Sequence, residues 1–358
     1  MLKRLLSFII SCTLALTFMP GVVSYAQTDT DNYYIESFSP AEQAIYEKVS
    51  AAVINCQSSI TLNGVSADRQ DILGRIGDTL LFYDPYTWNL ETLDYTSQGQ
   101  NVTFHFSYLV DYQSFVTMQE KLDTVVDEIL AETEDLSVLK KLYYIHDFIL
   151  RNCDYDLDSV YSGSPYGALV DGKAKCDGYS LALQMIAQRA GIPCVTVISM
   201  PQGGEFGHAW NKVKVSTSWY NIDLSSDDTT LKWDEICYDW FLLADSEMGS
   251  IHKEWNDPFV TEPKANNTKN SYYEIKKRSA STVAEAKEII KTQLDAMDFT
   301  RRNIAYVTVE ISDKEVLSEF VSLYKAGKIL TAGVVPKSGK ASAFINPERQ
   351  VVHIRITF

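Results

Sequence analysis

The sequence lacks the patterns that are typical of metalloproteins and of dithiol redox proteins. It contains no C-x-x-C pair, which argues against a zinc ribbon and against a dithiol redox motif. None of its 5 histidines is spaced like the ligands of a metal site. We therefore expect neither a metal ion nor a cofactor.

Positive charge and long apolar runs are also scarce. The formal net charge is −15 at pH 7, which argues against nucleic acid or an anionic membrane surface as the main partner. The apolar run at residues 5–18 is too short for an ordinary membrane span, so we expect no stable membrane insertion. With 46% hydrophobic residues in 358, the chain can build packed cores in more than one domain, and its oligomeric state stays open.

The N-terminus has the features of a secretory leader. Lys3 and Arg4 form a short basic region, the apolar run follows, and residues 24–26 supply small side chains at the two positions that a signal peptidase reads. We expect cleavage after Ala26 and export to the extracellular space or the cell surface. Of the 6 cysteines, Cys12 leaves with the leader, and the odd number that remains indicates at least one free thiol.

Composition and periodicity divide the rest of the chain. A capping box at residues 39–42 opens a helix, and residues 101–108 alternate like a half-buried strand. Residues 256–271 are polar and aperiodic, which indicates a linker, and further capping boxes at Thr282 and Ser312 indicate a small α/β domain beyond it. The predicted division is a signal peptide at 1–26, a helix and strand region at 27–135, a core at 136–256, a linker at 257–271 and a C-terminal domain of unknown role at 272–358.

The segment DGKAKCDGYSLALQMIAQRAGIPC, residues 171–194, places a cysteine ahead of a long apolar helix. Gly191 and Pro193 provide the glycine cap and the following proline that end such a helix. Cys176 then lies at the first turn, where unpaired N–H groups and the positive end of the helix dipole favour a thiolate. Gly178 leaves room for a substrate backbone, and the Cys176 N–H points toward a developing oxyanion. The competing interpretation of Cys176 is a small hydrophobic residue packed at the start of a core helix.

A thiol nucleophile needs a base, and the base needs an orienting group. Residues 208–224 read as two strands joined by a short turn. A two-residue turn at 216–217 would place Trp210 opposite Asp223, and a turn one residue earlier would place His208 there. In both registers His208 and Asp223 face the same side, directly paired or one diagonal apart. Each residue alone reads as an ordinary strand-end histidine or turn carboxylate, but their combination with Cys176 indicates a Cys-His-Asp catalytic group.

Four segments together carry a resemblance to a known family. YGALVDGKAKCDGYS, GHAWNKVKV, WYNID and FLLADSEMGSIH occur in the order and spacing of the transglutaminase-like superfamily, in the form found in exported bacterial proteins. The resemblance covers roughly residues 136–255. It implies an α+β fold, in which a papain-like core packs the cysteine-bearing helix on an antiparallel sheet, flanked by the N-terminal and C-terminal regions. It also implies Cys176 as nucleophile, His208 as base and acid, and Asp223 as orienting group.

The resemblance says less about the rest of the site. Tyr166, Gly178 and Trp210 are candidates for substrate binding or the oxyanion hole, although Tyr166 reads equally well as a packing aromatic. His252 matches a family pattern too, and we interpret it as structural because it lies well beyond the triad in the sequence. Relatives often carry an aromatic residue and paired acids just after the catalytic aspartate, so the different residues that follow Asp223 predict a different subsite.

These residues predict a secreted cysteine enzyme that acts on amide bonds through a thioester. Water as acceptor would give a peptidase or amidase, and an amine would give crosslinking. We favour hydrolysis, because excluding water requires a dedicated dry tunnel. Export makes extracellular proteins or cell-wall peptides the accessible substrates. The alternative is a non-catalytic exported binding or adhesion module that uses the fold as a scaffold.

Overall fold

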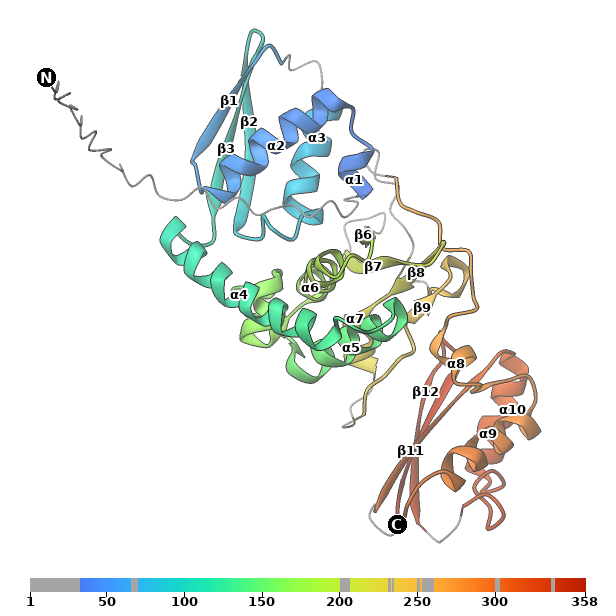
Figure 1. Cartoon of the computed structure of the whole chain (residues 1–358). Coiled ribbons are helices and arrows are strands. Elements are labelled where there is room, and N and C mark those ends of the chain that lie inside the picture. The colour runs from blue at the N-terminus through green and yellow to red at the C-terminus, as the bar shows by residue number, and fades with distance from the viewer. Residues whose placement is uncertain are drawn as a thin grey trace, which may run out of the picture.

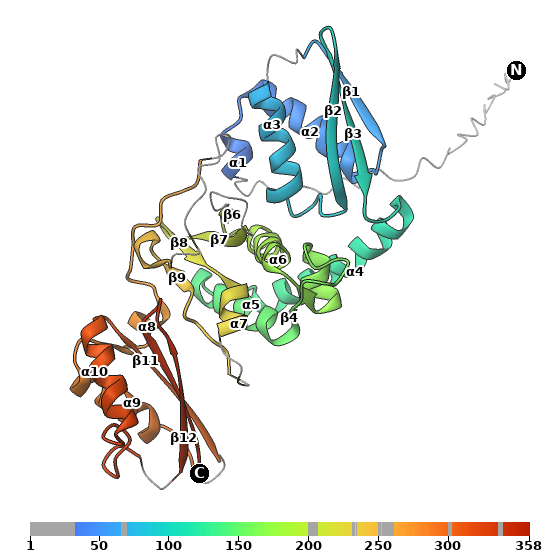
Figure 2. The same cartoon turned by 180° about the vertical axis from the view of Figure 1, so that it is seen from behind.

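The computed structural model describes residues 33–65, 70–199, 207–230, 233, 235–249, 252, 261–299, 303–335 and 339–358. The expected leader and part of the expected linker lie outside the described residues. The described chain forms three units in a row, each with its own hydrophobic core (Figure 1). Figure 2 shows the same order from behind, with the cysteine-bearing unit in the middle. The predicted α+β fold is therefore confirmed. Among the described helices, none is both long and apolar enough to cross a bilayer.

The N-terminal unit packs helices against a three-stranded antiparallel sheet (Figure 1). The predicted capping box is present, because the Ser39 hydroxyl accepts from the Glu42 N–H at 3.4 Å and the Ser39 N–H donates to the Glu42 carboxylate at 2.6 Å. The predicted strand at 101–108 is also present and buries its alternate apolar residues. In the sheet order β1-β3-β2, the elements are α1 (Tyr33–Glu36), α2 (Pro40–Ile54), α3 (Gln70–Asp78, continued by a π-helical turn at Thr79–Tyr83), β1 (Ser59–Asn63), β2 (Leu90–Gln98) and β3 (Asn101–Tyr108).

The middle unit is built around one buried helix, α6, which packs against two long helices and a four-stranded antiparallel sheet. The two long helices are α4 (Tyr112–Thr133) and α5 (Val138–Asn152), and α6 spans Cys176–Arg189. The sheet runs in the order β6 (Cys194–Ser199), β7 (His208–Val215), β8 (Ser218–Ile222) and β9 (Phe241–Leu243). Shorter elements are β4 (Asp154–Tyr155), a π-helical turn (Gly167–Asp171), β5 (Lys173–Ala174), α7 (Leu224–Thr230) and a 3₁₀ turn (Asp245–Glu247).

Helix α6 is fixed on the sheet by both apolar and polar contacts. Every residue of the helix except Asp177 and Arg189 is buried. The buried Gln184 accepts through Oε1 from the backbone N–H and the hydroxyl of Thr196 on β6, each at 2.7 Å. Leaving such a buried amide unpaired would cost about 1–3 kcal/mol, so these bonds select one position of α6 along the sheet. The predicted helix end is confirmed, because Gly191 follows it with φ at 74°.

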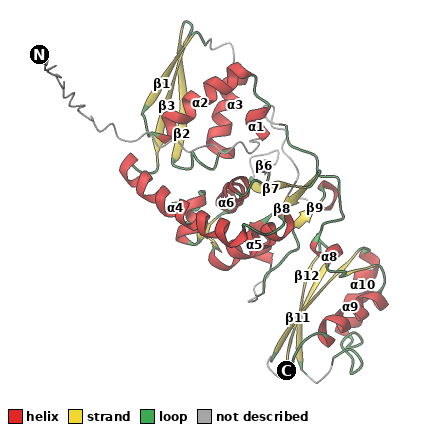
Figure 3. Ribbon diagram, in the orientation of Figure 1, coloured by secondary structure: helices red, strands yellow, loops and turns green. Residues whose placement is uncertain are grey.

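The C-terminal unit packs two helices on one face of a second four-stranded sheet (Figure 3). The capping box at Thr282 is confirmed. The box predicted at Ser312 is wrong: the next residue, Asp313, caps the helix by accepting from the N–H groups of Glu315 and Val316 at 2.8 and 3.0 Å. A carboxylate is the stronger acceptor at the positive end of a helix. In the sheet order β10-β11-β13-β12, the elements are α8 (Tyr272–Ile275), β10 (Ser279–Ala280), α9 (Val283–Asp295), β11 (Ile304–Ile311), α10 (Lys314–Lys325), β12 (Lys340–Asn346) and β13 (Val351–Thr357).

Candidate active site

Cys176 is the first residue of α6, two residues after the end of β5. Lys175 occupies the N-cap position in an extended conformation, and its side chain makes no capping hydrogen bond. No cap from Lys175 therefore competes for the N–H groups of the first turn, which favour an anion. The Cys176 sulfur donates to Oδ1 of Asp177 at 3.3 Å, and Lys175 Nζ pairs with the other oxygen of Asp177 at 3.0 Å. Cys176 is 8% exposed, so the sulfur lies close to the surface but is largely shielded.

His208 and Asp223 meet at the end of the β7–β8 hairpin. The hairpin closes with a two-residue turn at Ser216 and Thr217, in which Ser216 has a positive φ of 59°. Of the two registers that the sequence allows, this is the one that sets Trp210 opposite Asp223, so His208 lies one diagonal away. The two side chains nevertheless make direct contact, with His208 Nε2 2.6 Å from Asp223 Oδ2.

His208 also faces the cysteine. Burial alone would lower the pKa of His208, but the charge and hydrogen bond of Asp223, together with the neighbouring Cys176 thiol, outweigh burial and raise the pKa to about 10. Because Asp223 occupies Nε2, the other ring nitrogen, Nδ1, can exchange a proton with Cys176. The arrangement therefore favours an imidazolium beside the sulfur at neutral pH.

Asp223 is held as an anion by five converging donors. Its Oδ2 accepts from His208 Nε2, His252 Nε2 and Ser226 Oγ, each at 2.6 Å. Its Oδ1 accepts from Ser225 Oγ and the Ser226 N–H, each at 2.9 Å. Burial raises the pKa of this carboxyl, but the two histidines outweigh it and hold the pKa well below its usual range. The Ser226 N–H contact is also an N-cap bond, because Asp223 directly precedes α7. Such a carboxylate orients its histidine and does not take up the proton.

His252 joins the site although it is distant in the sequence. It lies 29 positions beyond Asp223, yet its Nε2 is 2.6 Å from Asp223 Oδ2. Its side chain is fully buried, and its ring centroid lies 4.5 Å from that of Trp240 and 5.2 Å from that of Trp210. No periodicity links these segments, so only the family pattern at His252 could have drawn attention to it.

Two of the additional candidates serve packing. A Cβ added at Gly178 would lie 2.3 Å from the Ser162 carbonyl oxygen and 2.9 Å from the Ala174 Cβ. The space beside Gly178 is thus filled by the chain itself, and the expectation that it leaves room for a substrate backbone is wrong. Tyr166 is buried and stacks on Trp88 with ring centroids 5.7 Å apart, which fits the packing alternative.

Trp210 supports the histidine. It is buried, and its ring lies against that of His208 with centroids 6.1 Å apart and an interplanar angle of 21°. Its indole N–H donates to Asn221 Oδ1 at 2.9 Å. Because an indole has only this one donor, Trp210 cannot also bind an oxyanion. Its contribution to the site is therefore to fix the plane of the His208 ring.

Tyr155 is a residue near the sulfur that sequence reasoning missed. It pairs in parallel with Ala174, two residues before the nucleophile, and it is 38% exposed. Burial, followed by the charges of Cys176 and Asp177, raises the pKa of Tyr155 to about 12, and its hydroxyl contacts the Cys176 N–H. A protonated phenol beside that N–H suits a second oxyanion donor. The two-residue strands that place it are too short to leave a periodic signal.

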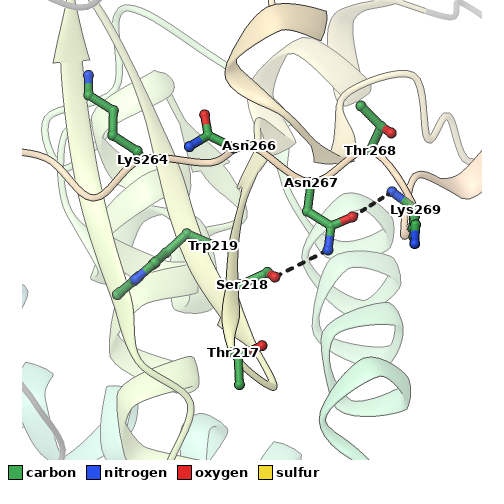
Figure 4. Close-up of a pocket in the computed structure, with 8 residues that line it drawn as sticks. All are labelled: Thr217, Ser218, Trp219, Lys264, Asn266, Asn267, Thr268 and Lys269. Carbon is green, nitrogen blue, oxygen red and sulfur yellow. Dashed lines mark hydrogen bonds between the residues drawn. The ribbon is translucent and has the colours of Figure 1, made fainter.

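A separate pocket lies at the tip of the β7–β8 hairpin, at the opposite end of β7 from His208 (Figure 4). Its volume is about 530 Å³, and residues 217–219, Lys264 and residues 266–269 contribute its walls. Asn267 crosses it, donating to Ser218 Oγ at 3.2 Å and accepting from the Lys269 N–H at 3.0 Å. Because the pocket is lined by neither His208 nor Cys176, we assign it no part in the chemistry of the site.

Within the described residues, two groups of side chains could hold a metal ion, namely His208, Asp223 and His252, and Cys237, Asp239 and His353. The first group consists of the histidine and aspartate of the candidate triad together with His252. In the second, Asp239 accepts from Tyr273 at 2.5 Å, Asn346 at 2.9 Å and His353 at 3.0 Å. Burial raises the pKa of Asp239, but His353 and these donors outweigh burial, so the pKa lies below its usual value. Hydrogen bonds thus account for both anions, and the second group joins the C-terminal unit to the core.

Comparison with known proteins identifies the class of the middle unit. The profile of the family described as "Transglutaminase-like superfamily" matches residues 123–224. This span contains Cys176, His208 and Asp223. Residues 123–224 thus form a transglutaminase-like domain, which confirms the resemblance seen in the sequence.

The similar proteins match only part of the chain. Kyphoscoliosis peptidase from Homo sapiens is 28% identical over 153 residues, which are 38% of this chain and 22% of that protein. Its counterpart from Mus musculus is 28% identical over 151 residues, with 37% and 22% covered. Among solved structures, the crystal structure of a TGase covers 47% of this chain and 51% of its own, with 12% identity and a TM-score of 0.27. A putative cysteine protease from Cytophaga hutchinsonii covers 37% and 61%, with 12% identity and a TM-score of 0.26.

Proposed function

We propose that this protein is a secreted cysteine enzyme that acts on amide bonds through a thioester acyl-enzyme. The observation that carries the proposal is the connected series Asp223–His208–Cys176. A carboxylate held by five donors contacts one nitrogen of an imidazole, and the thiol of a helix-start cysteine neighbours the same ring. A non-catalytic scaffold has no need for this combination of an oriented imidazole and a nucleophile.

The first half-reaction follows from these positions. Cys176 passes its proton to His208, and the sulfur attacks the carbonyl carbon of the substrate amide. The C–N bond then breaks while His208 returns the proton to the leaving amine, which leaves a thioester on Cys176. Asp223 stays ionised throughout, because its role is to stabilise the imidazolium and to fix the ring.

The developing oxyanion needs donors that are already in place. The Cys176 N–H at the start of α6 is the first, and the Tyr155 hydroxyl beside it is the second. Both lie at the positive end of the helix, where a negative charge is stabilised. This assignment takes the place of Tyr166, whose ring is committed to packing against Trp88.

In the second half-reaction, water attacks the thioester after giving a proton to His208, and the carboxylic acid leaves as the thiol is restored. We favour water over an amine as acceptor, because the mature site carries no sequence feature of a dry amine tunnel, and the curated relatives are named as peptidases. The leader-like N-terminus supports export, so extracellular proteins or cell-wall peptides are the proposed substrates.

The test is a screen of the mature chain against a peptide library and a fluorescent primary amine, read by mass spectrometry. Cleavage without amine incorporation is expected, and Cys176→Ala should abolish it. Cys56→Ser, which removes a partly exposed thiol elsewhere, should retain it. If the native protein shows no cleavage and no amine incorporation, the proposal is overturned in favour of an exported binding module.

A further inference from the structure

Two histidines share a single oxygen of Asp223. His208 Nε2 and His252 Nε2 each lie 2.6 Å from Oδ2, and their ring centroids are 5.2 Å apart with the ring planes at 77°. The Ser226 hydroxyl donates to the same oxygen at 2.6 Å. The oxygen that orients His208 is therefore also the acceptor of two further donors.

His252 donates to Asp223 through Nε2. Its Nδ1 is buried and makes no hydrogen bond with any described residue. Trp240 and Trp210 pack on the His252 ring and keep Nε2 directed at Asp223.

We propose that His252 is a positioning residue that holds Asp223 in place and limits how strongly this carboxylate binds the imidazolium of His208. The inference rests on the proposed function, because it concerns the same His208. Each donor on Oδ2 takes up part of the negative charge that would otherwise stabilise the imidazolium. A general acid must release its proton to the leaving amine, so an imidazolium bound too tightly is a poor acid.

The charged surroundings of His208 make the direction of the effect definite. Among the described residues, the titratable groups that face His208 are Cys176 from α6, Asp223 from the β8–α7 junction and His252. Asp177 contacts the Cys176 sulfur, and Tyr155 lies near the charges of Cys176, Asp177 and Asp223. If the His252 donor is lost, Asp223 becomes more basic and the imidazolium is stabilised, so the protonation midpoint of His208 rises.

The experiment measures this midpoint by NMR in the full mature chain with isotope-labelled histidine, in a Cys176→Ala background that removes coupling to the thiol. His252→Phe keeps an aromatic ring between the tryptophans but removes the donor, and should raise the midpoint by about one pH unit. His252→Gln keeps a donor and should stay within a few tenths of the parent value. Ser226→Ala removes the other hydroxyl from Oδ2 and should shift the midpoint in the same direction. Ser225→Ala, whose hydroxyl binds Oδ1, should shift it less.

The outcomes separate this inference from the proposed function. If iodoacetamide labelling of Cys176 at pH 7 in the native chain is as fast in His208→Ala as in wild type, the thiol–imidazole pair itself is refuted. If labelling depends on His208 but the midpoint is unchanged or lower in both Ser226→Ala and His252→Phe, only the role of His252 is refuted. Should His252→Phe fail to fold, the other two variants decide the matter. A Ser226→Ala midpoint that is unchanged or lower, or a folded His252→Gln whose midpoint departs from that of the parent by a full pH unit, refutes the inference.

Discussion

Asp223→Asn removes one negative charge while it keeps the size of a side chain that is 1% exposed. Burial lowers the pKa of His208, and the charge of Asp223 is the largest of the factors that together raise it to about 10. Compared with the usual value of about 6.5, this difference corresponds to roughly 5 kcal/mol in favour of the imidazolium. If the substitution removes half of this free energy, the transfer of the Cys176 proton to His208 becomes less favourable by up to about 70-fold.

The assay is the rate of iodoacetamide labelling of Cys176 at pH 7, followed on the Cys176 peptide by mass spectrometry. Asp227→Asn is the matched control, because Asp227 is equally buried at 1% and also binds a histidine Nε2, that of His146, at 3.1 Å. This control should change the rate by less than about threefold, whatever it does to the unfolding midpoint. A folded Asp223→Asn variant that labels as fast as the wild type would refute the reasoning.

Three further predictions concern the surroundings of the triad. Tyr155→Phe should lower kcat by about 10²-fold with little change in KM, because it removes an oxyanion donor, whereas Tyr166→Phe should leave kcat within about twofold; equal losses would contradict the assignment. Gly178→Ala should lower the free energy of unfolding by roughly 1–3 kcal/mol in urea titrations, because the methyl would meet a carbonyl oxygen, and an unchanged midpoint would show that the contact relaxes. The stability of the wild type should fall as the pH rises from about 6.5 to about 10. The sign follows because the folded-state pKa of His208 is raised to about 10, so its stabilising contribution is complete below the unfolded value and is lost above the folded one. His208→Gln should flatten this part of the profile, and parallel profiles would argue against the coupling.

The sequence predicted those parts of the site that a single segment encodes. The apolar run that follows Cys176 indicates where α6 begins, and Gly191 indicates where it ends. Cys176 is therefore predicted at the helix start. Strand parity puts His208 and Asp223 on one face whichever turn closes the hairpin. What parity cannot decide is the register. The turn uses Ser216 at a positive φ, a conformation that serine does not favour, so its sequence carried no turn signal.

Contacts between distant segments had no such local signal. His252 reaches Asp223 from beyond β9, and Tyr155 reaches the nucleophile through a two-residue parallel pairing. Gly178 shows the opposite error. Its lack of a side chain suggested open space, but a glycine equally permits close packing of the backbone, and only the tertiary structure distinguishes the two.

Asp223 combines two roles that the structure allows to be separated. As the residue before α7, it accepts from the Ser226 N–H and so caps that helix. As an anion, it stabilises the imidazolium of His208. Serine caps helices about as well as aspartate, so the cap alone would not require an acid at this position. The convergence of two histidines on Oδ2 has no counterpart in capping, because a cap uses one oxygen and a backbone N–H. The requirement for a carboxylate at Asp223 therefore comes from the charge that it places against His208.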